Sequence, residues 1–272
     1  MEKAQNKQQI IYGLRPVIEA IASGTQIERV LIQNGLNSSL LNELRTKLKE
    51  HDIPFQYVPV EKLNKMTTGN HQGVVATIAA VKYHSFMELM EQLTADPDES
   101  SLITHHSSLI THHSSLITHH SSLILLLDHI TDVRNMGAIA RTAECTGVAA
   151  LVVPDHGSAA LNEDAIKTSS GALLRLPVCR EQNLKTVVNL AKQCGYQVVA
   201  ATEKGAVHYR TVDFRQPTLL IMGNEETGIS PELLKMSDVR AKLPIVGEVA
   251  SLNVSVAAGV FMYEALEQRS MN

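Results

Sequence analysis

The stretch "LPIVGEVASLNVSVAAGVFMYEAL" (243–266) places an apolar strand pattern, a short loop and a long helix pattern in direct succession. Two other stretches have a similar layout. "NMGAIARTAECTG" (135–147) follows an apolar strand that ends at Asp128, and "LLIMGNEETGIS" (219–230) is a strand that opens into a turn with glycines. In an open parallel sheet, ligands bind beyond the carboxyl ends of the strands. We therefore expect all three loops to contribute to one site.

The same alternation extends over the whole region 123–272. Further apolar strands are predicted at "ALVVP" (150–154), "QVVAAT" (197–202) and "AKLPI" (241–245). Short apolar strands between helices are typical of a parallel sheet with helices on both faces. The fold class predicted for this region is therefore α/β, and its last helix is expected to run from about Asn253 to Arg269.

The first 84 residues form a separate pattern. Helices are predicted at "LRPVIEAIAS" and "SSLLNELRTKLKEHD", and strands at "ERVLIQ", "FQYVPV" and "VVATIAAV" (74–81). This predicts a small α/β domain at 1–84. Residues 85–122 are expected to link it to the second domain (123–272), because a short helix pattern there is followed by the polar "TADPDES".

The linker contains the phrase SLITHHS, which is repeated three times from residue 101 and holds six of the 12 histidines. A metal site needs ligands that converge in a fixed geometry, which adjacent histidines on a flexible segment do not supply. A coiled coil is disfavoured by the Thr, Ser and His content and by the absence of charged flanking positions. We therefore interpret the repeat as a tandem duplication in an exposed linker.

Composition narrows the class of protein. The 44% hydrophobic and 19% charged content is that of a soluble globular protein, and no apolar run approaches the length of a membrane span. The polar N-terminus lacks the apolar core of a signal peptide, and three cysteines without CxxC spacing indicate reduced thiols. These features favour the cytoplasm. The net charge of −4 neither indicates nor excludes an RNA partner.

Five polar residues in the three loops are candidates for chemistry: Asn135, Arg141, Glu225, Ser251 and Asn253. Each has a structural alternative. Asn135 could be a helix cap, and Arg141 could face solvent from an otherwise apolar helix. Glu225 could belong to a solvated acidic turn, and Ser251 and Asn253 could simply begin the last helix. Their joint occurrence at three strand ends favours a site.

Common motifs for nucleotide binding, zinc-dependent hydrolysis and serine hydrolysis are absent. The chain has no GxGxxG after a strand, no Walker lysine, no HExxH and no GxSxG. Instead, "NMGAIAR", "IMGNEETGI" and the stretch 243–266 resemble the three signature motifs of the SpoU (TrmH-like) family of RNA 2′-O-methyltransferases, within the knotted SPOUT superfamily. The N-terminal "IYGLRPVIEAI" and "HQGVVATIAAV" resemble the small ribosomal-protein-like RNA-binding domain of the branch that methylates guanosine in 23S rRNA.

The resemblance implies a deep trefoil knot, a rare exception to the rule that chains do not thread loops. It further implies a homodimer and S-adenosylmethionine as cofactor, contacted at Gly223, Leu243 and Leu252 with Thr202 nearby. A side chain at Gly223 would block close approach to the cofactor. No metal is expected, because a sulfonium is already activated.

The resemblance also assigns Arg141 to activation of the ribose hydroxyl. Because a guanidinium is nearly always protonated, we expect Arg141 to act together with an RNA phosphate and not as a simple base. Asn135 and Glu225 would orient it, and Ser251 and Asn253 would shape the substrate pocket. The alternatives are a tRNA methyltransferase, a non-catalytic RNA-binding assembly factor and another nucleotide-binding α/β enzyme.

Overall fold

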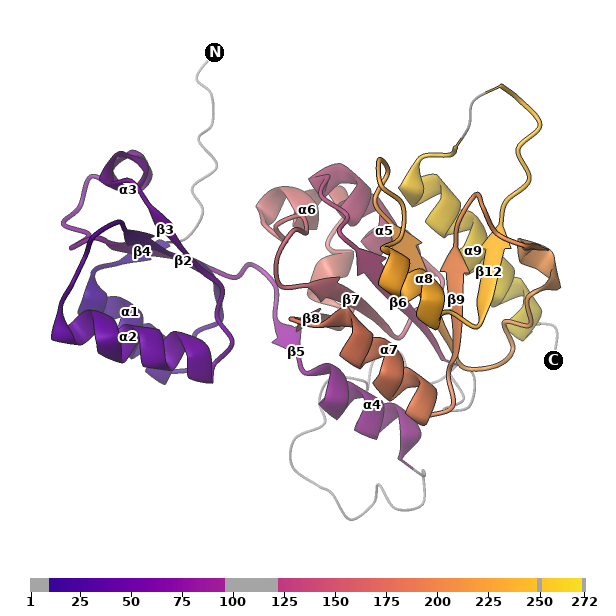
Figure 1. Ribbon diagram of the computed structural model, residues 1–272, viewed down its shortest axis with the longest axis horizontal. Coiled ribbons are helices and arrows are strands. Elements are labelled where there is room, and N and C mark those ends of the chain that lie inside the picture. Colours follow the sequence, from indigo (N-terminus) through magenta and orange to yellow (C-terminus); the bar gives the residue numbers. More distant parts are fainter. Residues whose placement is uncertain (1–9, 96–121, 249–250, 271–272) are drawn as a thin grey trace. The chain divides into compact units, whose positions relative to one another are not determined.

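The computed structural model describes residues 10–95, 122–248 and 251–270. The chain forms two compact units (Figure 1). Unit 1 comprises Met1–Lys82 together with Ala160–Glu163, and unit 2 comprises Tyr83–Ala159 and Asp164–Asn272. No helix within the described ranges is both long and apolar enough to cross a membrane. The SLITHHS repeat lies outside these ranges.

Unit 1 is a four-stranded sheet in the order β1-β4-β2-β3. Strand β4 is antiparallel to both of its neighbours, whereas β2 and β3 are parallel. Helices α1 and α2 pack their apolar sides on one face, and α3 covers part of the other (Figure 1). The elements are β1 (Ile10–Tyr12), α1 (Leu14–Ala22), β2 (Ile27–Gln33), α2 (Ser39–Glu50), β3 (Phe55–Val58), α3 (Val60–Met66) and β4 (Val74–Ile78).

Unit 2 is built on an eight-stranded sheet in the order β10-β12-β9-β11-β6-β7-β8-β5, and every neighbouring pair is parallel. The central strands are buried on both faces, as their uninterrupted apolar sequences predict. The strands are β5 (Tyr83–His84), β6 (Leu123–Asp128), β7 (Ala150–Pro154), β8 (Val178–Glu181), β9 (Gln197–Ala201), β10 (Val207–His208), β11 (Thr218–Gly223) and β12 (Val239–Lys242).

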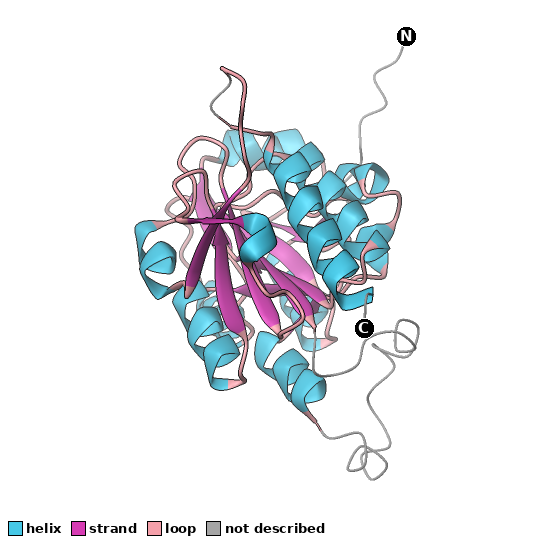
Figure 2. Cartoon of the chain, turned by 90° about the vertical axis from the view of Figure 1, so that its right-hand side faces the viewer, coloured by secondary structure: helices cyan, strands magenta, loops and turns pink. Residues whose placement is uncertain are grey.

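Helices cover both faces of this sheet (Figure 2). The helices α4, α7 and α8 share one core with alternate residues of the strands, while α5 and α9 lie side by side on the other face. The helices are α4 (Phe86–Thr94), α5 (Val133–Cys145), α6 (Glu163–Thr168), α7 (Leu184–Gln193), α8 (Pro231–Met236) and α9 (Val254–Ser270), with 3₁₀ turns η2 (Ala172–Leu174) and η3 (Tyr209–Thr211).

Three local features differ from the sequence prediction. The short helix expected at the start of the linker is α4, but its Phe86 is buried in the core of unit 2, so this helix is part of that unit. The last strand, β12, begins at Val239 and ends before Leu243, because Pro244 cannot donate to a strand ladder. The cap of α5 is Asp132, whose carboxylate accepts the backbone N–H of Asn135 at 3.0 Å, so Asn135 itself is not the cap.

The end of α9 is fastened to the segment that precedes β11. The Arg269 Nε donates to the Phe214 carbonyl at 2.7 Å, and the Gln268 side chain bonds both Phe214 N–H at 2.8 Å and the Val212 carbonyl at 3.1 Å. Burial lowers the pKa of the Arg269 guanidinium to about 10, which leaves it charged at neutral pH. These bonds hold 212–216 against the last helix. The trefoil knot stays a prediction.

Replacing Arg269 with alanine is expected to lower the free energy of unfolding by about 1.5–3 kcal/mol, because the carbonyl of the buried Phe214 loses a charged donor. The matched control is Arg215→Ala, since Arg215 is exposed and bonds only the neighbouring Asp213. Urea unfolding of the full chain, followed by circular dichroism, measures both. Equal midpoints for the two variants would contradict this assignment.

Candidate functional site

Two neighbouring strands bring the first two motif loops together. In the parallel pair β6 and β11, Asp128 lies beside Gly223 where both strands end. The Asp128 carboxylate is buried; it accepts the backbone N–H of Ser230 at 2.6 Å and contacts the His129 ring at 2.5 Å. In the other direction, the Asn224 amide donates to the His129 carbonyl at 2.8 Å. The loop after β11 is thereby fixed to the loop after β6.

The 224–228 turn explains why residue 223 is glycine. The Asn224 side chain accepts the N–H of Glu226 at 2.8 Å, and the backbones of Asn224 and Gly228 bond each other. A Cβ on Gly223 would overlap the backbone of Gly228 and Ile229. Glycine is thus required at position 223 by the chain's own turn, in addition to the close cofactor approach expected from the sequence.

Three of the candidate polar residues form one hydrogen-bonded group. The Asn135 amide donates to the Glu225 carboxylate through a short bond, and the Asn253 amide donates to Asn135 Oδ1 at 3.0 Å. Asn135 lies on α5, Glu225 lies in the turn after β11, and Asn253 immediately precedes α9. The group therefore joins all three motif segments, 118 positions apart at its widest.

Asn253 has a second role in this group. Its Oδ1 accepts the backbone N–H of Ser255 at 2.9 Å and the Ser255 hydroxyl at 2.6 Å, as the cap of a helix does. The start of α9 and the position of the Asn135 side chain are thus set by one amide. The Asn253 Oδ1 caps α9, and the Asn253 Nδ2 bonds Asn135 in the site.

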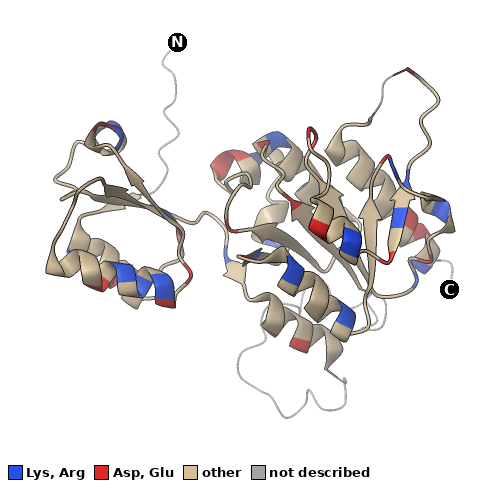
Figure 3. Cartoon of the chain, viewed as in Figure 1, with Lys and Arg blue, Asp and Glu red and all other residues tan. Residues whose placement is uncertain are grey.

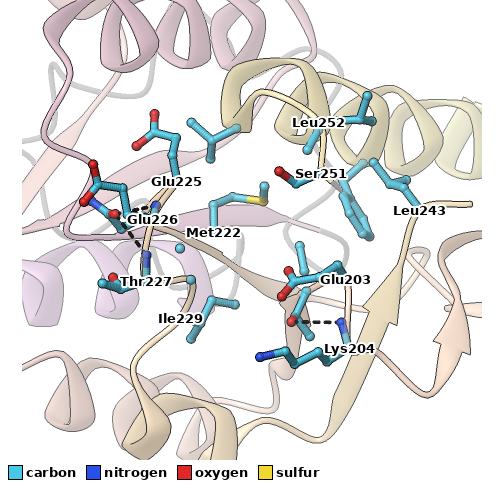
Figure 4. Close-up of a pocket in the computed structure, with 18 of the residues that line it drawn as sticks. Glu203, Lys204, Met222, Glu225, Glu226, Thr227, Ile229, Leu243, Ser251 and Leu252 are labelled. Carbon is cyan, nitrogen blue, oxygen red and sulfur yellow. Dashed lines mark hydrogen bonds between the residues drawn. The ribbon is translucent and has the colours of Figure 1, made fainter. Parts of the chain in front are cut away.

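A cavity of about 300 Å³ opens beside this group (Figure 4). All four residues expected to contact a cofactor, Thr202, Gly223, Leu243 and Leu252, line it together with Glu225 and Ser251. Figure 4 shows Met222 between the segment 225–227 and the segment 251–252. Thr202 is held in place because its N–H donates to the Ala241 carbonyl at 2.9 Å.

Several lining residues were not predicted from the sequence. Glu203 and Lys204 follow Thr202 at the end of β9, so the rule that ligands bind at carboxyl strand ends could have found them. Phe261 lies two turns into α9 and has no sequence signal that distinguishes it from a core residue. Met222 is the penultimate residue of an apolar strand and looks equally ordinary.

Arg141 is not part of the hydrogen-bonded group. It lies on the exposed side of α5, six residues after Asn135 and so about 9 Å along the helix axis. Within the described ranges, its guanidinium has no hydrogen bond or ion pair, unlike Arg269 at the end of α9. Arg141 is thus free to meet a group from outside the chain.

Other reactive groups in the described ranges give no competing site. No cluster of three or more His, Cys, Asp or Glu side chains is arranged to hold a metal ion there. Burial raises the pKa of the Cys179 thiol to about 12, with a contribution from the Glu181 carboxylate, so this thiol is inert at neutral pH. Among the described residues, neither a metal cluster nor the Cys179 thiol therefore competes with the cavity as a reactive site.

Two known protein families match this chain. Residues 122–263 match the SpoU rRNA Methylase family, and residues 10–84 match the RNA 2′-O ribose methyltransferase substrate binding family. Proteins of Staphylococcus haemolyticus and Staphylococcus aureus, assigned to the TrmH family of tRNA/rRNA methyltransferases, are each 33% identical over 96% of both chains.

Solved structures give the same result. The SpoU methyltransferase AviRb from Streptomyces viridochromogenes covers 97% of this chain and 91% of its own, with 25% identity and a TM-score of 0.56. The A. aeolicus TrmH/SpoU tRNA modifying enzyme covers 68% of this chain and 85% of its own, with 28% identity and a TM-score of 0.54. With one family matched across most of unit 2 and another across most of unit 1, this chain belongs to the SpoU rRNA methylase family, whose members are RNA methyltransferases. The family depends on S-adenosylmethionine, and the SpoU methyltransferase AviRb has also been solved in complex with this cofactor.

Proposed function

We propose that this protein transfers a methyl group from S-adenosylmethionine to a ribose 2′-hydroxyl of RNA, with the cavity beside Gly223 as the cofactor site. The observation that supports this most directly is the Asn135–Glu225–Asn253 group, which joins all three motif segments at the cavity. A chain that only bound RNA would have no need for such an arrangement beside a cavity.

The lining of the cavity suits this cofactor. Apolar side chains at Leu243, Leu252 and Phe261 can enclose an adenine ring. Glu203, Glu225 and Glu226 outnumber the one lining cation, Lys204. A negative site complements S-adenosylmethionine, which has a sulfonium and an ammonium group against one carboxylate. When bound, the cofactor supplies a methyl group already activated for displacement.

The protein's own task is to position and activate the hydroxyl. A ribose 2′-hydroxyl is a poor nucleophile, so alignment with the methyl group at about 3–3.5 Å would supply much of the rate. In our proposal Arg141, together with an RNA phosphate, orients the hydroxyl and stabilises the negative charge that develops on its oxygen. Asn135 and Glu225 hold the start of α5 and the facing turn in place, while Ser251 and Asn253 shape the pocket.

Replacing Arg141 with alanine is expected to lower the single-turnover methylation rate by about 10²–10³, the usual effect of removing a charge-stabilising donor. The dissociation constant for S-adenosylmethionine should stay within about twofold, because Arg141 does not line the cavity. Arg134→Ala is the matched control, since Arg134 is exposed one heptad earlier on α5. Quench-flow kinetics and calorimetry separate the two quantities. Weakened cofactor binding with an unchanged rate would contradict the role.

For the substrate we propose 23S rRNA, and within it a guanosine ribose. The support is that unit 1 precedes the catalytic unit and matches a substrate-binding family, which suits a large folded RNA. The alternative is transfer RNA, since relatives are assigned to both substrate classes. An RNA substrate and free thiols favour a cytoplasmic location.

Ribose methylation is expected on a 23S rRNA transcript when the purified protein is incubated with S-adenosylmethionine, and not on a mixed tRNA pool. Mapping resistance to alkaline cleavage locates the modified nucleotide, because a 2′-O-methyl group blocks the attacking hydroxyl. Methylation of tRNA alone would establish the alternative substrate. Cofactor binding without transfer to either RNA would favour an assembly factor.

We also propose a homodimer formed through the outer side of the α5/α9 layer. On α9, Val256 and Tyr263 are 52% and 55% exposed, and exposed apolar side chains that share one helix face can mark a protein–protein contact. They lie seven residues apart, on one stripe that turns away from the sheet. Arg141 is exposed on the outer side of α5 in the same layer. A second copy docked there would cover the apolar stripe and place this arginine near the interface.

Tyr263→Glu is expected to convert the dimer to a monomer at micromolar protein, because a charge would be placed in a desolvated contact. The control is Met87→Glu, since Met87 is 60% exposed on α4, outside the proposed interface. Sedimentation equilibrium measures the mass of each variant. A wild-type monomer, or a Tyr263→Glu variant that stays dimeric, would contradict this interface.

A further inference from the structure

Unit 1 has two tyrosines with similar exposure but different surroundings. Tyr12 on β1 is 40% exposed and Tyr57 on β3 is 38% exposed. The Tyr57 hydroxyl accepts the Arg45 Nε at 2.6 Å, and its ring packs edge-on against Phe55. Tyr57 is therefore already engaged. Among the described residues, the Tyr12 hydroxyl has no hydrogen bond and its ring stacks on no other side chain.

The Tyr12 ring is instead supported from one side by backbone. A Cβ on Gly69 would lie 2.5 Å from Tyr12 Cε2 and 2.6 Å from its hydroxyl oxygen, so only glycine lets the 67–73 loop lie flush against the ring. This support fixes the outer end of the side chain without using a second aromatic group. The ring is thereby oriented while much of its surface stays exposed.

The 67–73 loop is itself held rigidly. The His71 Nδ1 accepts the Gly73 N–H at 3.0 Å, so its Nε2 carries the hydrogen that is donated to Asn64 Oδ1 at 2.8 Å. The neighbouring Gln72 has φ +49°, an uncommon conformation for a residue with a side chain. Its Oε1 accepts the N–H of Leu14 at 3.3 Å and so ties the loop to the residues that follow Tyr12.

The polar surroundings of Tyr12 suit a nucleic acid. Asn70 and Gln72 of the loop are exposed, and so is Arg15, three residues after Tyr12. The guanidinium of Arg15 has no ion pair or hydrogen bond among the described residues. Further Lys and Arg residues lie on α2 and α3 of the same unit (Figure 3). An exposed cation three residues from an oriented aromatic ring suits an RNA that offers a phosphate and a base.

We propose that Tyr12 is the platform on which unit 1 stacks an unpaired base of its substrate RNA, with Gly69 as the positioning residue. The proposal rests on the proposed function, because it concerns how the same RNA is held. It adds a substrate feature: the recognised segment contains an unpaired nucleotide, such as a loop or bulge. Duplex RNA does not offer a base face for stacking, because its bases are stacked on one another.

The test uses the full chain and a synthetic RNA stem-loop with the fluorescent base 2-aminopurine in its loop. Stacking on Tyr12 should quench this fluorescence, and a matched RNA with 2-aminopurine in its stem should show no change. Tyr12→Ala should abolish the quenching and weaken binding about tenfold or more, the usual effect of losing one stacked base. Tyr12→Phe should preserve both, since the ring and not the hydroxyl is used.

Two further variants separate stacking from folding. Gly69→Ala should reduce the quenching, because its methyl group displaces the tyrosine ring, yet it should unfold at nearly the wild-type temperature since only a side-chain end must move. Tyr57→Ala is the matched control and should bind like wild type. Equal losses in Tyr12→Ala and Tyr57→Ala, or no quenching by wild type, would overturn the proposal. The assay needs no methyl donor, so its result does not depend on whether the protein transfers a methyl group.

Discussion

The arrangement of the site depends on the pairing of β6 with β11, which ends at Asp128 and Gly223. Both strands are buried, so the residues that follow must leave the sheet at the same edge. The Asp128 carboxylate bonds the far end of the second loop, and the Asn224 amide bonds the beginning of the first. Two crossing bonds leave Glu225 little freedom. Its contact with Asn135 then follows from the sheet, without any ligand.

Much of this could be predicted from the sequence, because apolar runs mark buried parallel strands and ligands bind where such strands end. The predicted strands at β7, β9 and β11 agree with the structure within one or two residues. The carboxyl-end rule also brought Asn135, Glu225 and Asn253 together as candidates, and the structure places them in one hydrogen-bonded group. Joint occurrence at three strand ends decided this prediction, because each residue taken alone has a structural explanation.

The remaining features could not be predicted, because they depend on tertiary contacts. Equally apolar strands do not encode their order, so nothing in the sequence places β12 beyond β9 or pairs β5 with β8. Asp132 and Asn135 are both good caps, and only the path of the chain selects the aspartate. Glycine is required at position 223 because the backbone of Gly228 packs against it. The sequence shows that the two residues are five positions apart, but it does not show that they are in contact.

The exposure of Arg141 bears directly on how the proposed chemistry could work. Two unit charges 4 Å apart interact by about 1 kcal/mol in water and by about 4 kcal/mol near a protein surface that excludes part of the solvent. A guanidinium that stayed on an open helix face would therefore contribute little to a developing oxyanion. The outer side of the same two-helix layer carries the apolar Val256 and Tyr263, whose exposure to water is unfavourable. A second copy of the chain would cover these apolar side chains, and together with an RNA phosphate it would exclude water from the Arg141 guanidinium. Assembly would then be part of the catalytic site itself, because it creates the surroundings in which this arginine is effective.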